Sequence, residues 1–204
     1  GPVIQEADIR ALSGGVTTDD IFDMVKKLRE KTEIPLVFMT YLNPVFHYGY
    51  EAFFERCQDV GTDGIIIPDL PFEEKEEVDV FASRYGIDLI SMIAPTSKER
   101  IRKIAKGAKG FLYVVSSMGV TGERTNITTD IGGMLKEIRS VSSVPAAVGF
   151  GIHTPDQAAE ISKTADGVIV GSAVVKLIEK YGSHAGGHLY TYVRMMKEAV
   201  SHSE

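Results

Sequence analysis

The sequence has little cysteine, no excess of basic charge and no long apolar run, and each shortage excludes a class of protein. Its 204 residues include a single cysteine, Cys57, so an internal disulfide framework is impossible and a reducing cytoplasm is expected. Lysine and arginine total 22 against 28 acidic residues, and the net charge of −6 argues against a nucleic-acid partner. No apolar stretch reaches the roughly 20 residues that span a bilayer, so no membrane contact is expected.

Metal-ligand spacing and a dinucleotide-binding turn are also missing. None of the five histidines is spaced with cysteine or acidic residues as zinc ligands are, so no metal is expected. His184 and His188 share a helical spacing, but Gly186 and Gly187 between them predict against a rigid helix there. No Gly-x-Gly-x-x-Gly turn follows an early strand, which argues against an open dinucleotide-binding sheet.

Two alternating periodicities run through the chain, in a composition of 44% apolar and 25% charged residues that suits one domain over residues 1–204. Segments with helical spacing include 3–12 at the start, 188–200 at the end, and two that follow hydroxyl caps at Thr17 and Thr154. Short β-branched, apolar runs predict six buried parallel strands, at 35–41, 64–69, 89–94, 111–116, 146–151 and 167–170.

Strand and helix alternating at this rhythm predict a parallel α/β fold, and glycines after the late strands favour a TIM (β/α)8 barrel with six strand–helix units present. Such barrels typically need about 250 residues, so about two further units are expected before Gly1, which is not an initiator methionine. The barrel domain of residues 1–204 is therefore expected to be N-terminally incomplete. Without those units two strand edges would be exposed, and the isolated chain is expected to be aggregation-prone or molten.

Three glycine-bearing segments follow the last three predicted strands, at 116–122, 149–152 and 170–174. Glycine lets backbone N–H groups approach an anion, and a helix N-terminus adds unpaired donors and positive dipole charge. Together, and in barrel order, the segments predict a phosphate site formed by Gly122, Gly151, Gly171 and Ser172. Taken singly, each glycine is explained as well by a tight turn.

Seven motifs, none diagnostic alone, stand in register from residue 1 to residue 173. They are Gly-Pro-Val-Ile-Gln (1–5), Met-Thr-Tyr-Leu-Asn-Pro (39–44), Asp-Gly-Ile-Ile-Ile-Pro-Asp-Leu-Pro (63–71), Ala-Pro-Thr (94–96), Tyr-Val-Val-Ser with Gly-Val-Thr-Gly (113–116 and 119–122), Gly-Phe-Gly-Ile (149–152) and Gly-Ser-Ala (171–173). Over nearly the whole chain, this set resembles the tryptophan synthase α family.

The resemblance implies a reaction of tryptophan biosynthesis, the retro-aldol cleavage of indole-3-glycerol phosphate to indole and glyceraldehyde 3-phosphate, with no metal or organic cofactor. It also implies a heterotetramer with a pyridoxal-phosphate-dependent β subunit, which joins the indole to serine. Cleavage needs a proton delivered to an indole ring carbon and another removed from a glycerol hydroxyl. A phosphate anchor holds the far end of the substrate so that the reacting bond meets these groups.

By resemblance, Tyr113 lies beside the reacting end. The length of the segment 117–130, its Gly, Thr and Asn content and its place after a barrel strand predict a mobile lid, which Thr121 would tie to a carboxylate when the lid closes. A plain disordered loop is the other interpretation of that segment. The rim glycines and Ser172 hold the phosphate. The implied indole walls are Phe150, Met39, Ile66 and Met92, and the implied partner contacts, in rim loops, are Asn43, Pro44, Asp69, Leu70 and Pro71. Barrel-interior packing explains Ile66 and Met92 at least as well, and turn chemistry explains the partner-contact residues.

The two catalytic acids of the family, a glutamate and an aspartate, have no match within residues 1–204. The aspartate belongs to an Ala-Asp-Gly-Pro turn whose last two letters are Gly1-Pro2, and the glutamate ends an earlier strand, so both are expected upstream of Gly1. Glu6 and Asp8 lie on a predicted solvated helix, and Asp69 belongs to the partner-facing loop. None of the three is expected to replace the missing acids.

Two other functions remain open. The first is another phosphosugar-binding enzyme on the same barrel, because a fold does not determine a function. The second is a catalytically silent subunit that binds an indole or phosphate ligand and regulates a partner. An upstream Glu-Leu-Gly-x-Pro-Phe-Ser-Asp-Pro phrase would favour the lyase, whereas binding without turnover would favour the silent subunit.

Overall fold

Six parallel strands form one sheet in the computed structural model, which describes residues 1–116, 130–149 and 151–201. Each strand pairs with its neighbour in the sequence, so the order across the sheet is β1 to β6. The six predicted strands are confirmed, and most are shorter than the runs that predicted them. Their bounds are β1 Val37–Met39, β2 Gly64–Ile66, β3 Asp88–Ile93, β4 Leu112–Val115, β5 Ala146–Gly149 and β6 Gly167–Ile169.

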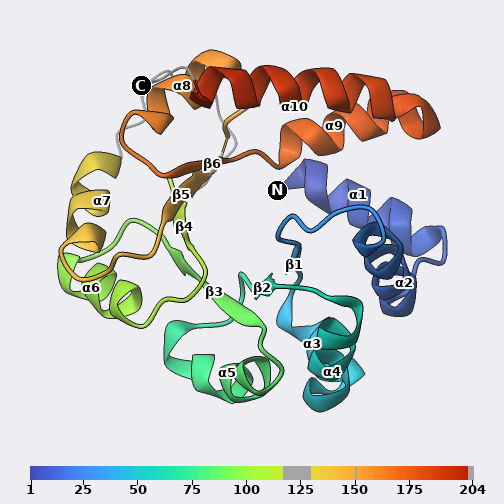
Figure 1. The fold of residues 1–204 in the computed structure, drawn as a ribbon, viewed down its shortest axis with the longest axis horizontal. Helices are drawn as coiled ribbons and strands as arrows, with labels where there is room; N and C mark the ends of the chain where they lie inside the picture. The colour runs from blue at the N-terminus through green and yellow to red at the C-terminus, as the bar shows by residue number, and fades with distance from the viewer. Residues whose placement is uncertain (117–129, 150, 202–204) are drawn as a thin grey trace.

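Helices surround the sheet on its outer side (Figure 1). Consecutive parallel strands need a crossover connection, and each connection here carries at least one helix, as in a (β/α) barrel. The helices are α1 Pro2–Ser13, α2 Thr18–Arg29, α3 Leu42–Tyr48, α4 Tyr50–Val60, α5 Lys75–Arg84, α6 Lys98–Lys106, α7 Ile131–Arg139, α8 Pro155–Ser162, α9 Ser172–Tyr181 and α10 Ala185–Ser201, with short 3-10 turns η1 Phe72–Glu74 and η2 Gly182–His184.

Both predicted hydroxyl caps are confirmed. Thr17 Oγ1 accepts the Asp20 N–H at 3.3 Å, and the Asp20 carboxylate accepts the Thr17 N–H at 2.8 Å, which closes a capping box on α2. Thr154 and Gln157 form the same box on α8, with Pro155 at the first helical position. The local sequence therefore determines where these two helices begin.

The hydrophobic core lies between the sheet and the helices, in two large clusters. One joins β1, β2 and β3 to α2 and α4, where the ring of Phe22 packs edge-on against Phe38 and Tyr48 at centroid distances of 5.6 Å. The other joins β3, β4 and β5 to α6 and α7 around the fully buried Ile93 and Leu112.

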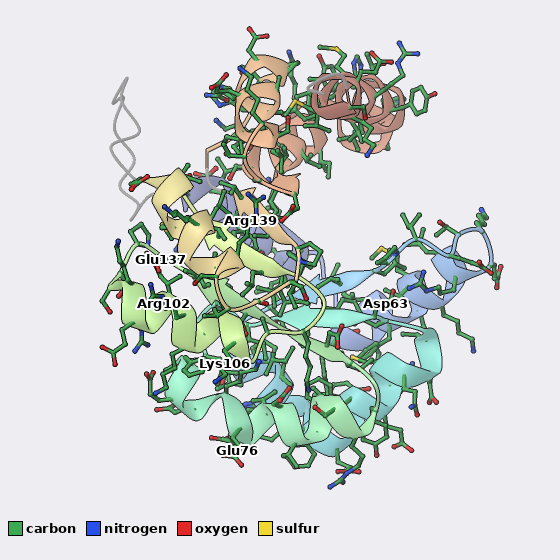
Figure 2. The ribbon with its side chains drawn as sticks, turned by 60° about the vertical axis from the view of Figure 1, so that its left-hand side comes forward. Asp63, Glu76, Arg102, Lys106, Glu137 and Arg139 are labelled. Atoms are coloured by element: carbon green, nitrogen blue, oxygen red, sulfur yellow. The ribbon has the colours of Figure 1, made fainter. Side chains whose placement is uncertain are left out.

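One carboxylate is buried between two of these helices, α6 and α7. Glu137 of α7 is only 8% exposed and pairs with two cations of α6, Lys98 at 3.2 Å and Arg102 at 2.6 Å. Figure 2 shows Arg102 and Glu137 on these neighbouring helices. Because a buried charge is costly unless it is paired, the two cations account for the position of Glu137.

At two places an aspartate that immediately precedes a strand bonds to the preceding strand–helix unit. Its carboxylate contacts both the start of the preceding strand and the arginine at the end of the helix before that strand. Asp63, just before β2, pairs with Arg29 at the end of α2 and accepts the Leu36 N–H at 2.7 Å. Arg29 also donates through Nε to the Gly61 carbonyl at 2.7 Å. The aspartate thus joins the end of one helix to the approaches of two strands.

The second tie repeats the first at the other end of the sheet. Asp166, just before β6, pairs with Arg139 at the end of α7 at 3.4 Å and accepts the Ala146 N–H at 2.9 Å. Arg139 donates to the Thr164 carbonyl at 2.7 Å, and this carbonyl precedes the aspartate by two residues, as Gly61 precedes Asp63. Both ties lie at the edge where the strands start, which in barrels serves stability and not catalysis.

The prediction against a rigid helix around Gly186 and Gly187 is wrong. Both glycines and His188 lie inside α10, which packs against α8 and α9 and buries Ala185 and Met196. Each glycine costs about 1 kcal/mol of helix propensity, and this tertiary packing outweighs the cost. The ring of His188 stacks on Tyr181, with centroids 3.6 Å apart.

β1 and β6 are the outer strands, and within the described residues each pairs on one side only. Near them, α1 and α9 pack together, and Arg10 pairs with Glu179 at 3.2 Å (Figure 1). The expected aggregation or molten character of the isolated chain stays a prediction. None of the described helices is long and apolar enough to cross a bilayer.

We expect Asp63→Ala and Asp166→Ala each to lower the free energy of unfolding by about 1–3 kcal/mol, because each leaves a backbone N–H and an arginine without their shared acceptor. Urea unfolding measures the change. Asp59→Ala is the control, since Asp59 is exposed and accepts no hydrogen bond within the described part of the chain. Losses equal to that of the control would show that the ties contribute nothing.

Candidate functional site

One face of the sheet carries the side chains predicted to line the barrel mouth. In a parallel pair, residues in register point to the same face, as do residues two apart along one strand. Met39 is in register with Ile66, and Met92 with Tyr113. Ile66 is also in register with Ile90, two residues before Met92, so all of these side chains share one face. Most residues that alternate with them along the strands belong to the core clusters under the helices, so this face is the inner one.

These side chains differ in how far they are open to a ligand. Met39 is 57% exposed, whereas Ile66 is 7% exposed and is packed as an interior residue. Met92 and Tyr113 are half-buried. Geometry alone therefore makes Met39, Met92 and Tyr113 better walls than Ile66.

The ring of Tyr113 lies directly against Gly149. A Cβ atom on Gly149 would come within 2.7 Å of the Tyr113 Oη and 2.9 Å of its Cζ, closer than real Cβ contacts allow. Val115, two residues after Tyr113, is in register with Gly149, which brings the ring and the glycine to the same face. The sequence signal for this contact is a glycine inside a strand, which marks a close approach of another group.

Tyr113 remains a neutral phenol at the inner face. Burial raises the pKa of Tyr113 above the ordinary value of 10.0, because the phenolate would lose hydration. The hydroxyl is thus both a hydrogen-bond donor and an acceptor at neutral pH.

Two of the three glycines predicted to bind phosphate follow neighbouring strands at equivalent positions. Gly149 of β5 is in register with Ile169 of β6, and Gly151 and Gly171 each come two residues later. Gly151 has φ +81°, a conformation that favours glycine, and a Cβ atom on either residue would meet nothing within 4 Å. Backbone at both positions therefore faces open space at the same end of the sheet.

The helix after Gly171 begins without a side-chain cap. Gly171 is the N-cap of α9, and no side chain there accepts an N–H of its first turn, which Ser172 opens. The first-turn N–H groups of a helix lack partners within the helix, and the dipole adds positive charge there. The start of α8 differs, because Thr154 and Gln157 already accept its first N–H groups. Of these two helices, α9 therefore has the first-turn N–H groups that are better able to bind an anion at this rim.

Some predicted site residues lie outside the described residues. These are Phe150, Thr121 and Gly122, with the rest of the segment 117–129. A contact that the sequence did not predict is made by Tyr192 of α10, whose hydroxyl donates to the His153 carbonyl at 2.9 Å beside the Gly151 turn. Among the described side chains, no group of three or more His, Cys, Asp or Glu is placed to hold a metal ion.

Asn43 and Pro44, predicted in a rim loop, instead lie in the first turn of α3, so that prediction is wrong. The Asp69 carboxylate, which follows β2, accepts the Leu42 N–H at 2.9 Å, whereas Tyr41 at the N-cap supplies no side-chain bond. A helix cap from 27 residues downstream cannot be read locally. Pro44 is tolerated because N–H groups in the first turn need no partner within the helix.

We expect Gly149→Ala to cost about 1–3 kcal/mol of unfolding free energy, as overpacking against a rigid ring does. In a Tyr113→Ala background the same substitution should cost less than about 0.5 kcal/mol, a coupling that a double-mutant cycle in urea measures. Gly107→Ala is the control, because its Cβ would meet nothing within 4 Å and its φ is −105°. An equal cost of Gly149→Ala in both backgrounds would show that the ring is not what requires the glycine.

Comparison with known proteins gives one consistent result. The family model for the tryptophan synthase alpha chain matches residues 1–201. The tryptophan synthase alpha chain of Lacticaseibacillus casei is 50% identical over 200 residues, which cover 98% of this chain and 75% of the relative. That of Geobacter sulfurreducens is 44% identical over 202 residues, with 98% and 76% covered.

Solved structures agree with the sequences. The α2β2 tryptophan synthase complex of Pyrococcus furiosus contains a chain with a TM-score of 0.88 and 34% identity, over 97% of this chain and 81% of that one. The tryptophan synthase alpha chain of Legionella pneumophila has a TM-score of 0.85 and 34% identity, with 98% and 76% covered. The inner face, the two rim glycines and the start of α9 without a side-chain cap agree with these matches. The matches show that the chain belongs to the tryptophan synthase alpha chain family.

Proposed function

We propose that the protein cleaves indole-3-glycerol phosphate to indole and glyceraldehyde 3-phosphate, as the α subunit of a cytoplasmic tryptophan synthase. The observation that carries the proposal is the pair Gly151 and Gly171, each two residues past neighbouring strands in register, beside an uncapped helix. That arrangement suits a phosphoryl group held by backbone N–H groups. Family membership supplies the reaction.

The phosphate anchor leaves the reacting end of the substrate over the inner face of the sheet. In the proposal Gly151, Gly171, Ser172 and Gly122 hold the phosphoryl oxygens. Held at that end, the substrate places its reacting bond near Tyr113, and fixing the geometry is what lowers the barrier. The neutral Tyr113 hydroxyl contributes a hydrogen bond and carries no charge.

A flat apolar indole needs apolar walls, and Met39 and Met92 of the shared face provide them, with Phe150 as the family counterpart outside the described residues. Methionine adapts its shape and makes favourable sulfur–aromatic contacts. Ile66 lies behind these walls, because it is almost fully buried.

None of the described carboxylates is assigned to proton transfer. Asp69 is committed to the Leu42 N–H, and Glu6 lies exposed on α1. The proposal leaves proton transfer to the glutamate and the aspartate of the family, which the resemblance puts before Gly1.

The partner surface is proposed at the rim around α3. Asn43, Pro44, Asp69 and Pro71 are exposed there, and Leu70 is half-buried. Two aromatic side chains add apolar area, Tyr41 at 59% and Phe46 at 62% exposed. Exposed aromatics are enriched at protein–protein interfaces, and the proposed occupant is the pyridoxal-phosphate-dependent β subunit.

The decisive experiment is indole release from indole-3-glycerol phosphate by the natural protein, with and without the β subunit. The proposal expects indole in both cases and faster release in the complex. Binding of glyceraldehyde 3-phosphate without any indole release would keep the phosphate site and overturn the lyase.

We expect Gly171→Ala to weaken glyceraldehyde 3-phosphate binding by about tenfold, roughly 1.4 kcal/mol, because the new Cβ would occupy the space of the phosphoryl group. The unfolding free energy should hardly change, since that Cβ meets nothing within 4 Å and φ is −114°. Calorimetric titration and urea unfolding give the two values, with Gly107→Ala as control. Wild-type affinity in Gly171→Ala would place the phosphate elsewhere.

We expect Asp69→Ala to weaken association with the β subunit by about fivefold to tenfold, since losing a helix cap costs about 0.5–2 kcal/mol and would loosen the first turn of α3. Asp69→Asn keeps an oxygen acceptor for the Leu42 N–H, so its affinity should stay within about threefold of wild type. Interferometry against immobilised β subunit measures both. Equal losses would mean that Asp69 acts through its charge on the partner and not through α3.

A further inference from the structure

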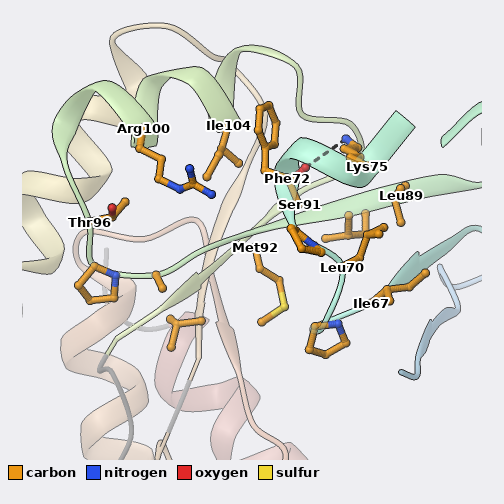
Figure 3. A pocket seen from close by; sticks show the side chains of 16 residues that line it. Ile67, Leu70, Phe72, Lys75, Leu89, Ser91, Met92, Thr96, Arg100 and Ile104 are labelled. Atoms are coloured by element: carbon orange, nitrogen blue, oxygen red, sulfur yellow. Dashed lines mark hydrogen bonds between the residues drawn. The ribbon is translucent and has the colours of Figure 1, made fainter. Parts of the chain in front are cut away.

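A cavity of about 470 Å³ lies beside β3, under η1, the start of α5 and α6 (Figure 3). Small-molecule sites are typically about 300–1,000 Å³, so it has room for a ligand. The wall is largely apolar, with Leu70, Phe72, Leu89 and Ile104 among its residues. It shares Ile90, Met92 and Val115 with the inner face, but in Figure 3 Met92 points to the side of β3 opposite Lys75 and Ser91.

The cavity exists because β2 leaves β3 early. The β2–β3 pairing ends at Ile66 and Ile90, and from Ser91 onward β3 pairs with β4 alone. Past β2 the chain turns away through Pro68 and Pro71, which have no N–H to donate to a strand. The space beside Ser91 is therefore not filled by a neighbouring strand.

One cation at this cavity has little to pair with. Lys75 is half-buried, and its Nζ donates to Ser91 Oγ at 3.2 Å, a hydroxyl that is itself only 7% exposed. An ammonium has three N–H donors, and no carboxylate of the described residues lies within ion-pairing distance of this one. Burial lowers the pKa of Lys75, while Asp79 and Asp88 raise it and Lys109 lowers it further.

The other cation that lines the cavity is already neutralised. Arg100 of α6 makes a two-point pair with Glu73 of η1, at 2.7 and 3.0 Å. Lys103 lies with its Nζ 5.6 Å from the centre of the Phe72 ring, outside the set of lining residues. Among the described side chains that line the cavity, Lys75 is thus the cation without a carboxylate partner, and most of the other lining residues are apolar.

We propose that this cavity binds a small molecule that carries a single carboxylate on a flat apolar body. The carboxylate pairs with Lys75 and accepts from Ser91, and the body lies against Phe72, Leu70 and Ile104. Pairing a half-buried ammonium gains more than pairing an exposed one, because water screens it less. A phosphate dianion fits less well, since a single free cation would face two charges among apolar side chains.

The test uses phenylacetate as the probe, titrated calorimetrically into the unmodified protein, with phenylacetamide as its neutral analogue. We expect saturable binding of phenylacetate and about tenfold weaker binding of phenylacetamide. Glyceraldehyde 3-phosphate at saturation should leave phenylacetate binding unchanged, because Lys75 and Ser91 lie on the side of β3 opposite Met92, whereas the proposed phosphate rim follows β5 and β6. Competition between the two would move phenylacetate to the barrel mouth and overturn the cavity assignment.

Two lysine-to-methionine variants test which lysine binds the carboxylate of phenylacetate. Lys75→Met keeps the apolar stem and should weaken phenylacetate binding about tenfold, whereas Lys109→Met should leave it within about twofold. Lys109 lies nearby, bonds Ser83 at 2.6 Å and does not line the cavity. Equal effects of the two variants would overturn the proposal, as would equal affinity for phenylacetate and phenylacetamide or no saturable binding. In those cases Lys75 and Ser91 form only a structural contact.

Discussion

The register of the parallel strands is the constraint on which the rest of the molecule depends. A shift of one residue between β5 and β6 would turn Ile169 to the other face and separate Gly151 from Gly171. The same register puts Met39, Ile66, Met92 and Tyr113 on one inner face. Because parallel strands all end at the same edge, their following loops meet there, and a phosphate rim can form from residues far apart in the sequence.

Aspartates make different contacts at the two ends of the parallel strands. Asp63 and Asp166 each bind an arginine and a backbone N–H at the end of the sheet where the strands start, and so connect neighbouring units. Asp69 lies at the opposite edge, where it caps α3 and shapes the proposed partner surface. A carboxylate accepts several hydrogen bonds at once, which is why one residue type performs both tasks.

The sheet is closely packed where Tyr113 meets Gly149, whereas a cavity is left open beside β3. On the inner side Tyr113 fills the room that a side chain at 149 would need, so the phenol is held at the mouth. The early departure of β2 leaves a cavity beside β3 that reaches from Ser91 and Lys75 on the outer side to Met92 of the inner face. The first arrangement belongs to the proposed lyase, and the two share Met92, whereas Lys75 and Ser91 belong to the cavity alone.

The sequence by itself determined the six strands, the capped starts of α2 and α8, and the places of Gly151 and Gly171 just after β5 and β6. These depend on periodicity and local caps, which are properties of neighbouring residues. Only the tertiary structure decided that Asp69 starts α3, that Gly186 and Gly187 lie inside α10, and that Gly149 makes room for Tyr113. Each of those results depends on contacts between residues distant in the chain, and their energies are not visible in any local stretch of sequence.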